Sequence, residues 1–99
     1  MKYLLNILQV AQDDIATAAA WYDQQRAGLG YDFVLDVEEC MERIVQLPES
    51  CREVIKPFRR LVMFSFPYLI YYRLHAKNID VVAVVHSGRE PAYIASRLQ

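Results

Sequence analysis

The chain has 99 residues, a formal net charge of −1 and a hydrophobic fraction of 55%, and twelve of its residues are Phe, Tyr or Trp. This composition excludes intrinsic disorder, and the length is enough for one domain, residues 1–99, to bury a core without disulfides or a metal. No apolar run reaches the roughly 18 residues of a membrane-spanning helix, so we expect no membrane span.

Cys40 and Cys51 have no CxxC spacing or other ligand spacing, and no signal peptide is recognisable. We therefore expect reduced thiols in a cytoplasmic protein, with no metal and no cofactor.

The first thirty residues predict a strand and then a helix. Residues 3–8, YLLNIL, are short and apolar, and we expect an edge strand that pairs with a later sheet. A helix is expected from about residue 9 or 13 to residue 27, because the segment is rich in alanine. Its buried stripe follows the helical period: Ala11, Ile15, Ala18 or Ala19, and Tyr22. Gly28 and Gly30 are expected to end it, since glycine adopts the left-handed conformation of a C-terminal cap.

A second helix is expected over residues 31–47, antiparallel to the first because the connection is short. Its apolar positions keep the helical period: Phe33, Val37, Cys40 or Met41, and Ile44. Pro48 ends it. Three carboxylates are expected on its outward, solvated face: Glu38, Glu39 and Glu42.

The second half of the chain predicts a β-meander. Residues 61–66, 68–75 and 79–86 are crowded with β-branched and aromatic residues, and residues 53–56 suggest a further short strand. The connections are too short for parallel crossovers, so these strands are antiparallel. The fold class is α+β in the order β-α-α-β-β-β-β, with residues 91–97 forming one or two helical turns.

Alternation along the last strand predicts a fully apolar set on one face, namely Ile79, Val81, Ala83 and Val85. Neither face of the sheet is cleanly polar. We therefore expect helices to cover one face and another element or a partner chain to cover the second.

Charge divides the chain into an acidic half and a basic half. Residues 1–51 hold three Lys or Arg and nine Asp or Glu, a net −6, whereas residues 52–99 hold eight and three, a net +5. A polyanion or an acidic partner peptide would then meet the sheet. The alternative is that the asymmetry only solubilises the two faces.

A series of short motifs along the chain resembles, in content and order, the RelE/ParE superfamily of bacterial toxins. They are A-x-x-D-I (Ala11, Asp14, Ile15), Trp21-Tyr22, the GLG turn followed by Phe33, Leu47-Pro48, F-P-Y with I-x-Y (Phe66, Pro67, Tyr68, Ile70, Tyr72), and V-x-H-x-x-R-x-P (Val84, His86, Arg89, Pro91). Together they span most of the chain.

The resemblance implies the toxin of a type II toxin–antitoxin system, often described as plasmid stabilisation, that is neutralised by a cognate antitoxin. RelE-like members cut messenger RNA on the ribosome, and ParE-like members inhibit DNA gyrase. The Trp-Tyr pair, the GLG turn and the closing motif are closer to the ParE branch, which needs no catalytic set. A degenerate, inactive toxin is a further alternative, and the chain could form a homodimer or a heterotetramer with antitoxin.

The nuclease alternative has its own candidate residues. Cleavage through the RNA 2′-hydroxyl requires a base, an acid and cations that stabilise the phosphorane. The candidates are Arg60, Arg73, His86, Arg89 and Tyr93. Four of them also have a structural interpretation: His86 as a hydrogen-bonded histidine, Arg89 as a link that fixes the C-terminal tail to the sheet, and Arg60 and Arg73 as like charges that lie across from each other on adjacent strands.

Overall fold

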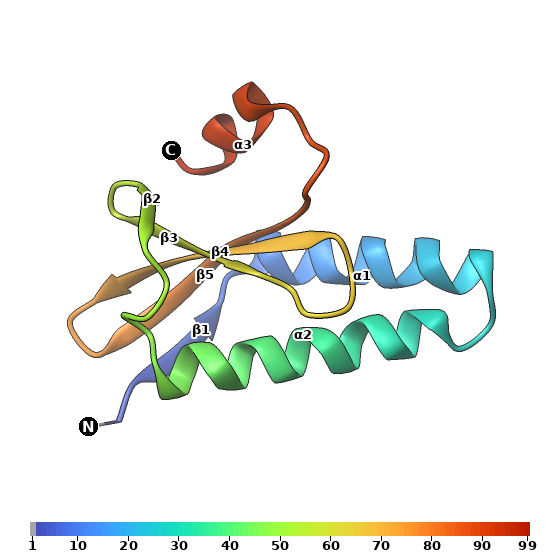
Figure 1. The fold of residues 1–99 in the computed structure, drawn as a ribbon, viewed down its shortest axis with the longest axis horizontal. Helices are drawn as coiled ribbons and strands as arrows, with labels where there is room; N and C mark the ends of the chain where they lie inside the picture. Colours follow the sequence, from blue (N-terminus) through green and yellow to red (C-terminus); the bar gives the residue numbers. More distant parts are fainter. Residues whose placement is uncertain (1) are drawn as a thin grey trace.

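The computed structural model describes residues 2–99 and has two layers, a twisted sheet and a helical hairpin, with a short helix on the other side of the sheet (Figure 1). Its elements in chain order are β1 (Leu4–Ile7), α1 (Gln9–Gln25), α2 (Leu29–Gln46), β2 (Glu53–Ile55), β3 (Phe58–Val62), β4 (Tyr68–His75), β5 (Asn78–His86) and α3 (Pro91–Arg97). The predicted α+β class and element order are confirmed.

The sheet has five strands in the order β1-β5-β4-β3-β2. The four C-terminal strands form the predicted antiparallel meander. β1 is an edge strand, as expected, and it pairs parallel with β5, so the sheet is mixed. β1 pairs only as far as Val81, and the last part of β5 is left as an outer edge of the sheet.

The helical hairpin packs one face of the sheet through small and aromatic residues. Ala11 and Ala18 of α1 and Phe33 of α2 are buried in a core that includes Ile70 and Tyr72 of β4. These residues occupy the predicted stripes, and Glu38, Glu39 and Glu42 are exposed as predicted.

The two glycines of the hairpin turn have different roles. Gly28 adopts φ +90° between the helices, a conformation that glycine tolerates. Gly30 was expected to end the first helix, but it lies inside α2, where a Cβ atom would collide with the Ala19 carbonyl oxygen. The Asp23 carboxylate accepts hydrogen bonds from both glycine N–H groups, at 3.1 and 2.9 Å, and so caps the start of α2.

The prediction of one apolar set on the last strand was wrong because β5 contains a bulge. Tyr71 pairs with Ala83 and Tyr72 with Val81, which leaves Val82 as an extra residue. An extra residue shifts the alternation of the strand by one. Val84 therefore joins the helix-side core, whereas Ala83 and Val85 lie on the opposite face.

The strand predicted over residues 61–66 instead runs from Phe58 to Val62, and residues 63–67 form a loop. The buried carboxylate of Asp36 accepts hydrogen bonds from the N–H groups of Ser65 and Phe66, at 2.9 and 3.2 Å. Those two amide groups are engaged by a side chain, so they do not continue the strand ladder.

The second face of the sheet is covered in part by the end of the same chain. Leu98 is buried against Leu69, Tyr71 and Val85, and Tyr93 and Ile94 of α3 pack on the same cluster. Figure 1 shows α3 across the sheet from the hairpin. The expected second cover is thus supplied within the chain, at this part of the sheet.

Candidate functional site

A pocket of about 600 Å³ lies between α1, the end of β5 and the segment that leads into α3. It is lined by Asp13, Asp14, Thr17, Ala18, Trp21, Tyr22, Tyr68, Val84, Val85, His86, Arg89 and Tyr93. Four of these side chains are aromatic rings of Trp or Tyr, and the pocket opens where β1 no longer covers the edge of β5. Its composition, apolar walls with a few polar groups, is typical of a recognition site.

The α1 wall of the pocket is an aromatic pair supported from the core. Trp21 is 54% exposed and meets Tyr22 edge to face, with ring centroids 5.1 Å apart. Tyr22 stacks on buried Phe33 at 5.4 Å and also contacts Phe66. The exposed indole is therefore fixed by packing beneath it, and such rings are frequent anchors at protein interfaces.

The opposite wall of the pocket carries Arg89 and His86, whereas the α1 side adds the carboxylates of Asp13 and Asp14. The Arg89 guanidinium lies 3.5 Å from the centroid of the Tyr93 ring, a cation–π contact, and both residues follow β5. The His86 ring contacts the Tyr68 ring edge to face, with the ring centroids 5.2 Å apart. The Nδ1 atom of His86 accepts a hydrogen bond of 2.9 Å from the Gly88 N–H. This backbone contact matches the structural interpretation of His86.

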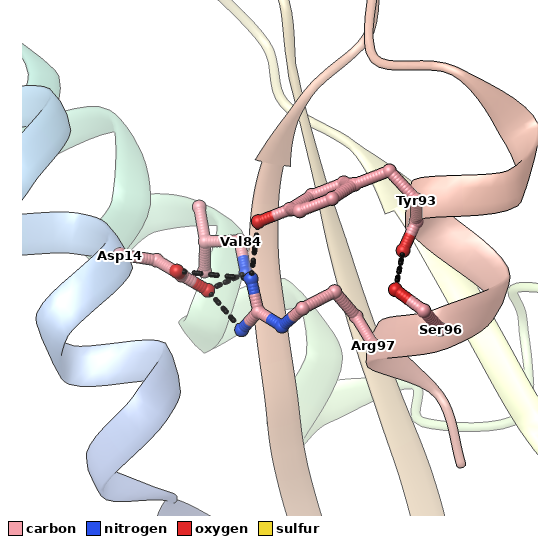
Figure 2. Close-up of polar contacts among 5 residues, drawn as sticks. All are labelled: Asp14, Val84, Tyr93, Ser96 and Arg97. Carbon is pink, nitrogen blue, oxygen red and sulfur yellow. Dashed lines mark hydrogen bonds and ion pairs between the residues drawn. The ribbon is translucent and has the colours of Figure 1, made fainter.

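A charged cluster beside the pocket links three elements, α1, β5 and α3 (Figure 2). Arg97 donates hydrogen bonds to both carboxylate oxygens of Asp14, at 3.1 and 2.7 Å, and a third to the Tyr93 hydroxyl at 3.1 Å. Asp14 also accepts the Val84 N–H at 2.9 Å. The hydrogen bond to Asp14 raises the pKa of Arg97, which stays charged.

This cluster holds the C-terminal helix α3 against the edge of β5. Beyond Val81, β5 has no strand within residues 2–99 on the side where β1 lies. The Val84 N–H, which a strand carbonyl would otherwise accept, is bound there by the Asp14 carboxylate. Arg97 then ties α3 to α1 across the strand edge. An edge amide that is engaged in this way is less available for uncontrolled strand pairing.

The five candidate catalytic residues fall into two groups. His86, Arg89 and Tyr93 line the pocket together. Arg73 lies at the other end of β4 from Tyr68, the residue that pairs with His86. Five residues separate Arg73 from Tyr68, which is about 17 Å along the strand. There it forms a 3.3 Å ion pair with Asp80.

Arg60 also lies away from the pocket lining, and its expected position opposite Arg73 was wrong. It pairs with Tyr71, whereas Arg73 pairs with Phe58, so the two arginines are diagonal neighbours. The Asp80 carboxylate, rather than a bound anion, balances the charge of Arg73.

The cluster of Asp14 and Arg97 was not predicted from the sequence. The two residues are separated by 83 positions, and only the A-x-x-D-I motif drew attention to Asp14. The motif also places Ala11 and Ile15 in or against the core, so its aspartate is the one member that reaches the strand edge.

No group of three or more His, Cys, Asp or Glu side chains in residues 2–99 could hold a metal ion. Cys40 and Cys51 are free thiols, and burial raises the pKa of Cys40 to about 12. None of the helices formed by residues 2–99 has the length and apolar character to span a bilayer.

Comparison with known proteins matches residues 5–91 to the family described as "ParE toxin of type II toxin-antitoxin system, parDE". The chain belongs to the ParE toxin family. "Toxin ParE2" of Mycobacterium tuberculosis, strains CDC 1551 / Oshkosh and ATCC 25618 / H37Rv, is 25% identical over 99 residues, which cover 99% of this chain and 94% of the relative.

A solved structure shares the fold. The "Chromosomal ParDE TA system from P. aeruginosa" superposes with a TM-score of 0.67 at 14% identity, over 86% of this chain and 96% of the other. The resemblance to the ParE branch is thus confirmed. The chain is a ParE-type toxin of a type II toxin–antitoxin system, a class in which toxin and antitoxin are partners.

Proposed function

We propose that this ParE-type toxin arrests growth by inhibiting DNA gyrase and that a cognate antitoxin neutralises it. The observation that carries the proposal is the family match over residues 5–91. The pocket supports the antitoxin part of the proposal, because its exposed Trp21 and the packed aromatic rings beneath it suit binding of another protein.

The arrangement of the cations favours inhibition by binding over RNA cleavage. Cleavage needs cations gathered around one phosphate, with an acid and a base within hydrogen-bonding reach. Arg73 is about 17 Å of strand away from His86 and is already paired with Asp80. His86 uses its Nδ1 as an acceptor for a backbone amide.

Ribosome-dependent cleavage of messenger RNA is the second candidate, and one observation favours it. His86, Arg89 and Tyr93 line a single pocket, so an acid or base, a cation and a phenol are close to one another. If these residues acted on RNA, replacing His86 by alanine would abolish toxicity together with the cleavage of messenger RNA.

The antitoxin is proposed to occupy the pocket at the β5 edge. Trp21 offers an exposed anchor there, and the Arg89 guanidinium has no carboxylate partner among residues 2–99. A segment with a bulky apolar side chain and a nearby Asp or Glu would fill the pocket and pair with Arg89. Such a segment is of the acidic kind expected from the positive charge of residues 52–99.

Expression in growing cells tests the proposal. We expect growth arrest, plasmid DNA that loses negative supercoils, and rescue when the product of the adjacent gene is co-expressed. Arrest with unchanged plasmid topology and in-frame cuts in translated messenger RNA would reverse the ranking. Growth without arrest would point to a degenerate toxin.

A further inference from the structure

We propose that Phe64 is the anchor residue with which this chain binds its target protein. Phe64 belongs to the 63–67 loop, and buried Asp36 fixes the conformation of that loop. The inference rests on the proposed function, since it takes gyrase as the target. It concerns a surface that shares no lining residue with the Trp21 pocket.

The loop that carries Phe64 is fixed on both sides. Met63 is buried and donates its N–H to the Tyr68 carbonyl at 2.9 Å, and Phe66 packs against the aromatic core. Between them, one oxygen of Asp36 accepts the N–H groups of Ser65 and Phe66. A carboxylate that is 5% exposed is costly to bury unless it is hydrogen-bonded; here Oδ2 binds the loop, and Oδ1 accepts a hydrogen bond from the Cys40 thiol at 3.7 Å.

The result of this arrangement is an exposed ring. Phe64 is 53% exposed although both Met63 and Phe66 turn inward. It borders a shallow depression of about 320 Å³ whose other lining residues belong to α2: Glu39, Glu42, Arg43 and Gln46. Leu35, 38% exposed, lies one helical turn before Glu39. A rigidly presented aromatic side chain loses little conformational entropy on binding, which is what a binding hot spot needs.

The charges around Phe64 define the partner. Among the exposed residues of α2, four are carboxylates and one is a cation, and they are Asp32, Glu38, Glu39, Glu42 and Arg43. Of these, Glu39, Glu42 and Arg43 line the depression at Phe64, so its border carries a net charge of −1 and a phosphate backbone gains little there. The complementary partner is a protein cleft that accepts an aromatic ring and is bordered by Lys or Arg. An enzyme that acts on DNA presents such cationic surfaces.

Inhibition of gyrase supercoiling by purified variants tests this inference. Phe64→Ala should raise the concentration for half-inhibition by about 30-fold, the loss typical of a hot-spot side chain. Phe64→Tyr should retain inhibition. Val10→Ala removes an apolar side chain of the same exposure, 54%, on another helix, and serves as the matched control with unchanged inhibition. Antitoxin binding by each variant reports that the fold is intact.

A second variant guards against local misfolding of the loop. Replacing Glu39 and Glu42 together by lysine leaves Phe64 and Asp36 in place and should weaken inhibition about tenfold, with a reduced dependence on salt. Equal inhibition by the parent, Phe64→Ala and the double lysine variant would overturn this inference and leave gyrase as the target. Absence of inhibition by the parent chain would reject the proposed function, and this inference with it.

Discussion

Replacing Asp14 by alanine removes three hydrogen bonds at once, two from Arg97 and one from the Val84 N–H. Both charged side chains are 19% exposed, so solvent screens the pair only in part. A largely buried, two-fold charge-assisted contact contributes about 2 kcal/mol, and the single bond from the Val84 N–H to the carboxylate at least about 1 kcal/mol. We therefore expect Asp14→Ala to cost about 3 kcal/mol of the free energy of unfolding.

A double-mutant cycle separates these two contributions. Arg97→Met keeps the apolar stem but removes the charge, and should cost about 2 kcal/mol, because Asp14 retains its bond to Val84. In the Asp14→Ala background the same change should cost little, which gives a coupling of about 2 kcal/mol by urea denaturation. Amide exchange at Val84 should accelerate in Asp14→Ala and stay slow in Arg97→Met. If the losses of unfolding free energy of the two variants were additive, or if each were below about 0.5 kcal/mol, the contact would contribute no more than an exposed ion pair, which would refute this reasoning.

Three further predictions concern the hairpin, the core thiol and the pocket. Gly30→Ala should destabilise the chain by about 2 kcal/mol or more in thermal unfolding, because the new methyl group meets the Ala19 carbonyl; an unchanged midpoint would refute the close contact. Cys40 has a pKa raised by burial to about 12, above its ordinary value of 9.0, so its thiol stabilises the fold below pH 9 and loses that effect as pH rises. Between pH 8 and pH 10 the parent should lose about 1.4 kcal/mol more than Cys40→Ala, and parallel pH profiles would contradict this. Trp21→Ala should weaken antitoxin binding about tenfold or more by calorimetry, and an affinity equal to that of Val10→Ala would remove the indole from the interface.

Local patterns in the sequence predict the parts of this fold that depend on local physics. Alanine content and helical periodicity locate α1 and α2, and the density of β-branched and aromatic residues locates β4 and β5 to within a residue. The bulge at Val82 cannot be recognised in the sequence. Residues 81–85 are all apolar, so the alternation of polar and apolar residues that would reveal a change of face is missing.

The position of β3 depends on a contact that only the tertiary structure brings together. Asp36 lies on the buried stripe of α2 between Phe33 and Cys40, and a charged residue on such a stripe was the available signal that it serves another segment. Which segment it serves is set by the packing of the hairpin on the sheet. The same holds for Asp14 and Arg97, which meet only when the chain end crosses the edge of β5.

Of the candidate site residues, the closing motif was the most informative part of the sequence. It placed His86 and Arg89 together because the spacing is local, and the pocket contains both. Arg60 and Arg73 were selected by charge alone, and charge does not determine register: a cross-strand partner, Asp80, neutralises Arg73.

Gyrase supercoiling of relaxed plasmid, titrated with the purified chain up to micromolar concentration, shows whether this toxin inhibits gyrase. We predict a dose-dependent loss of supercoiled product that an equimolar amount of antitoxin restores. Full supercoiling at every concentration, together with cleavage of messenger RNA by the same preparation in a translating extract, would contradict it.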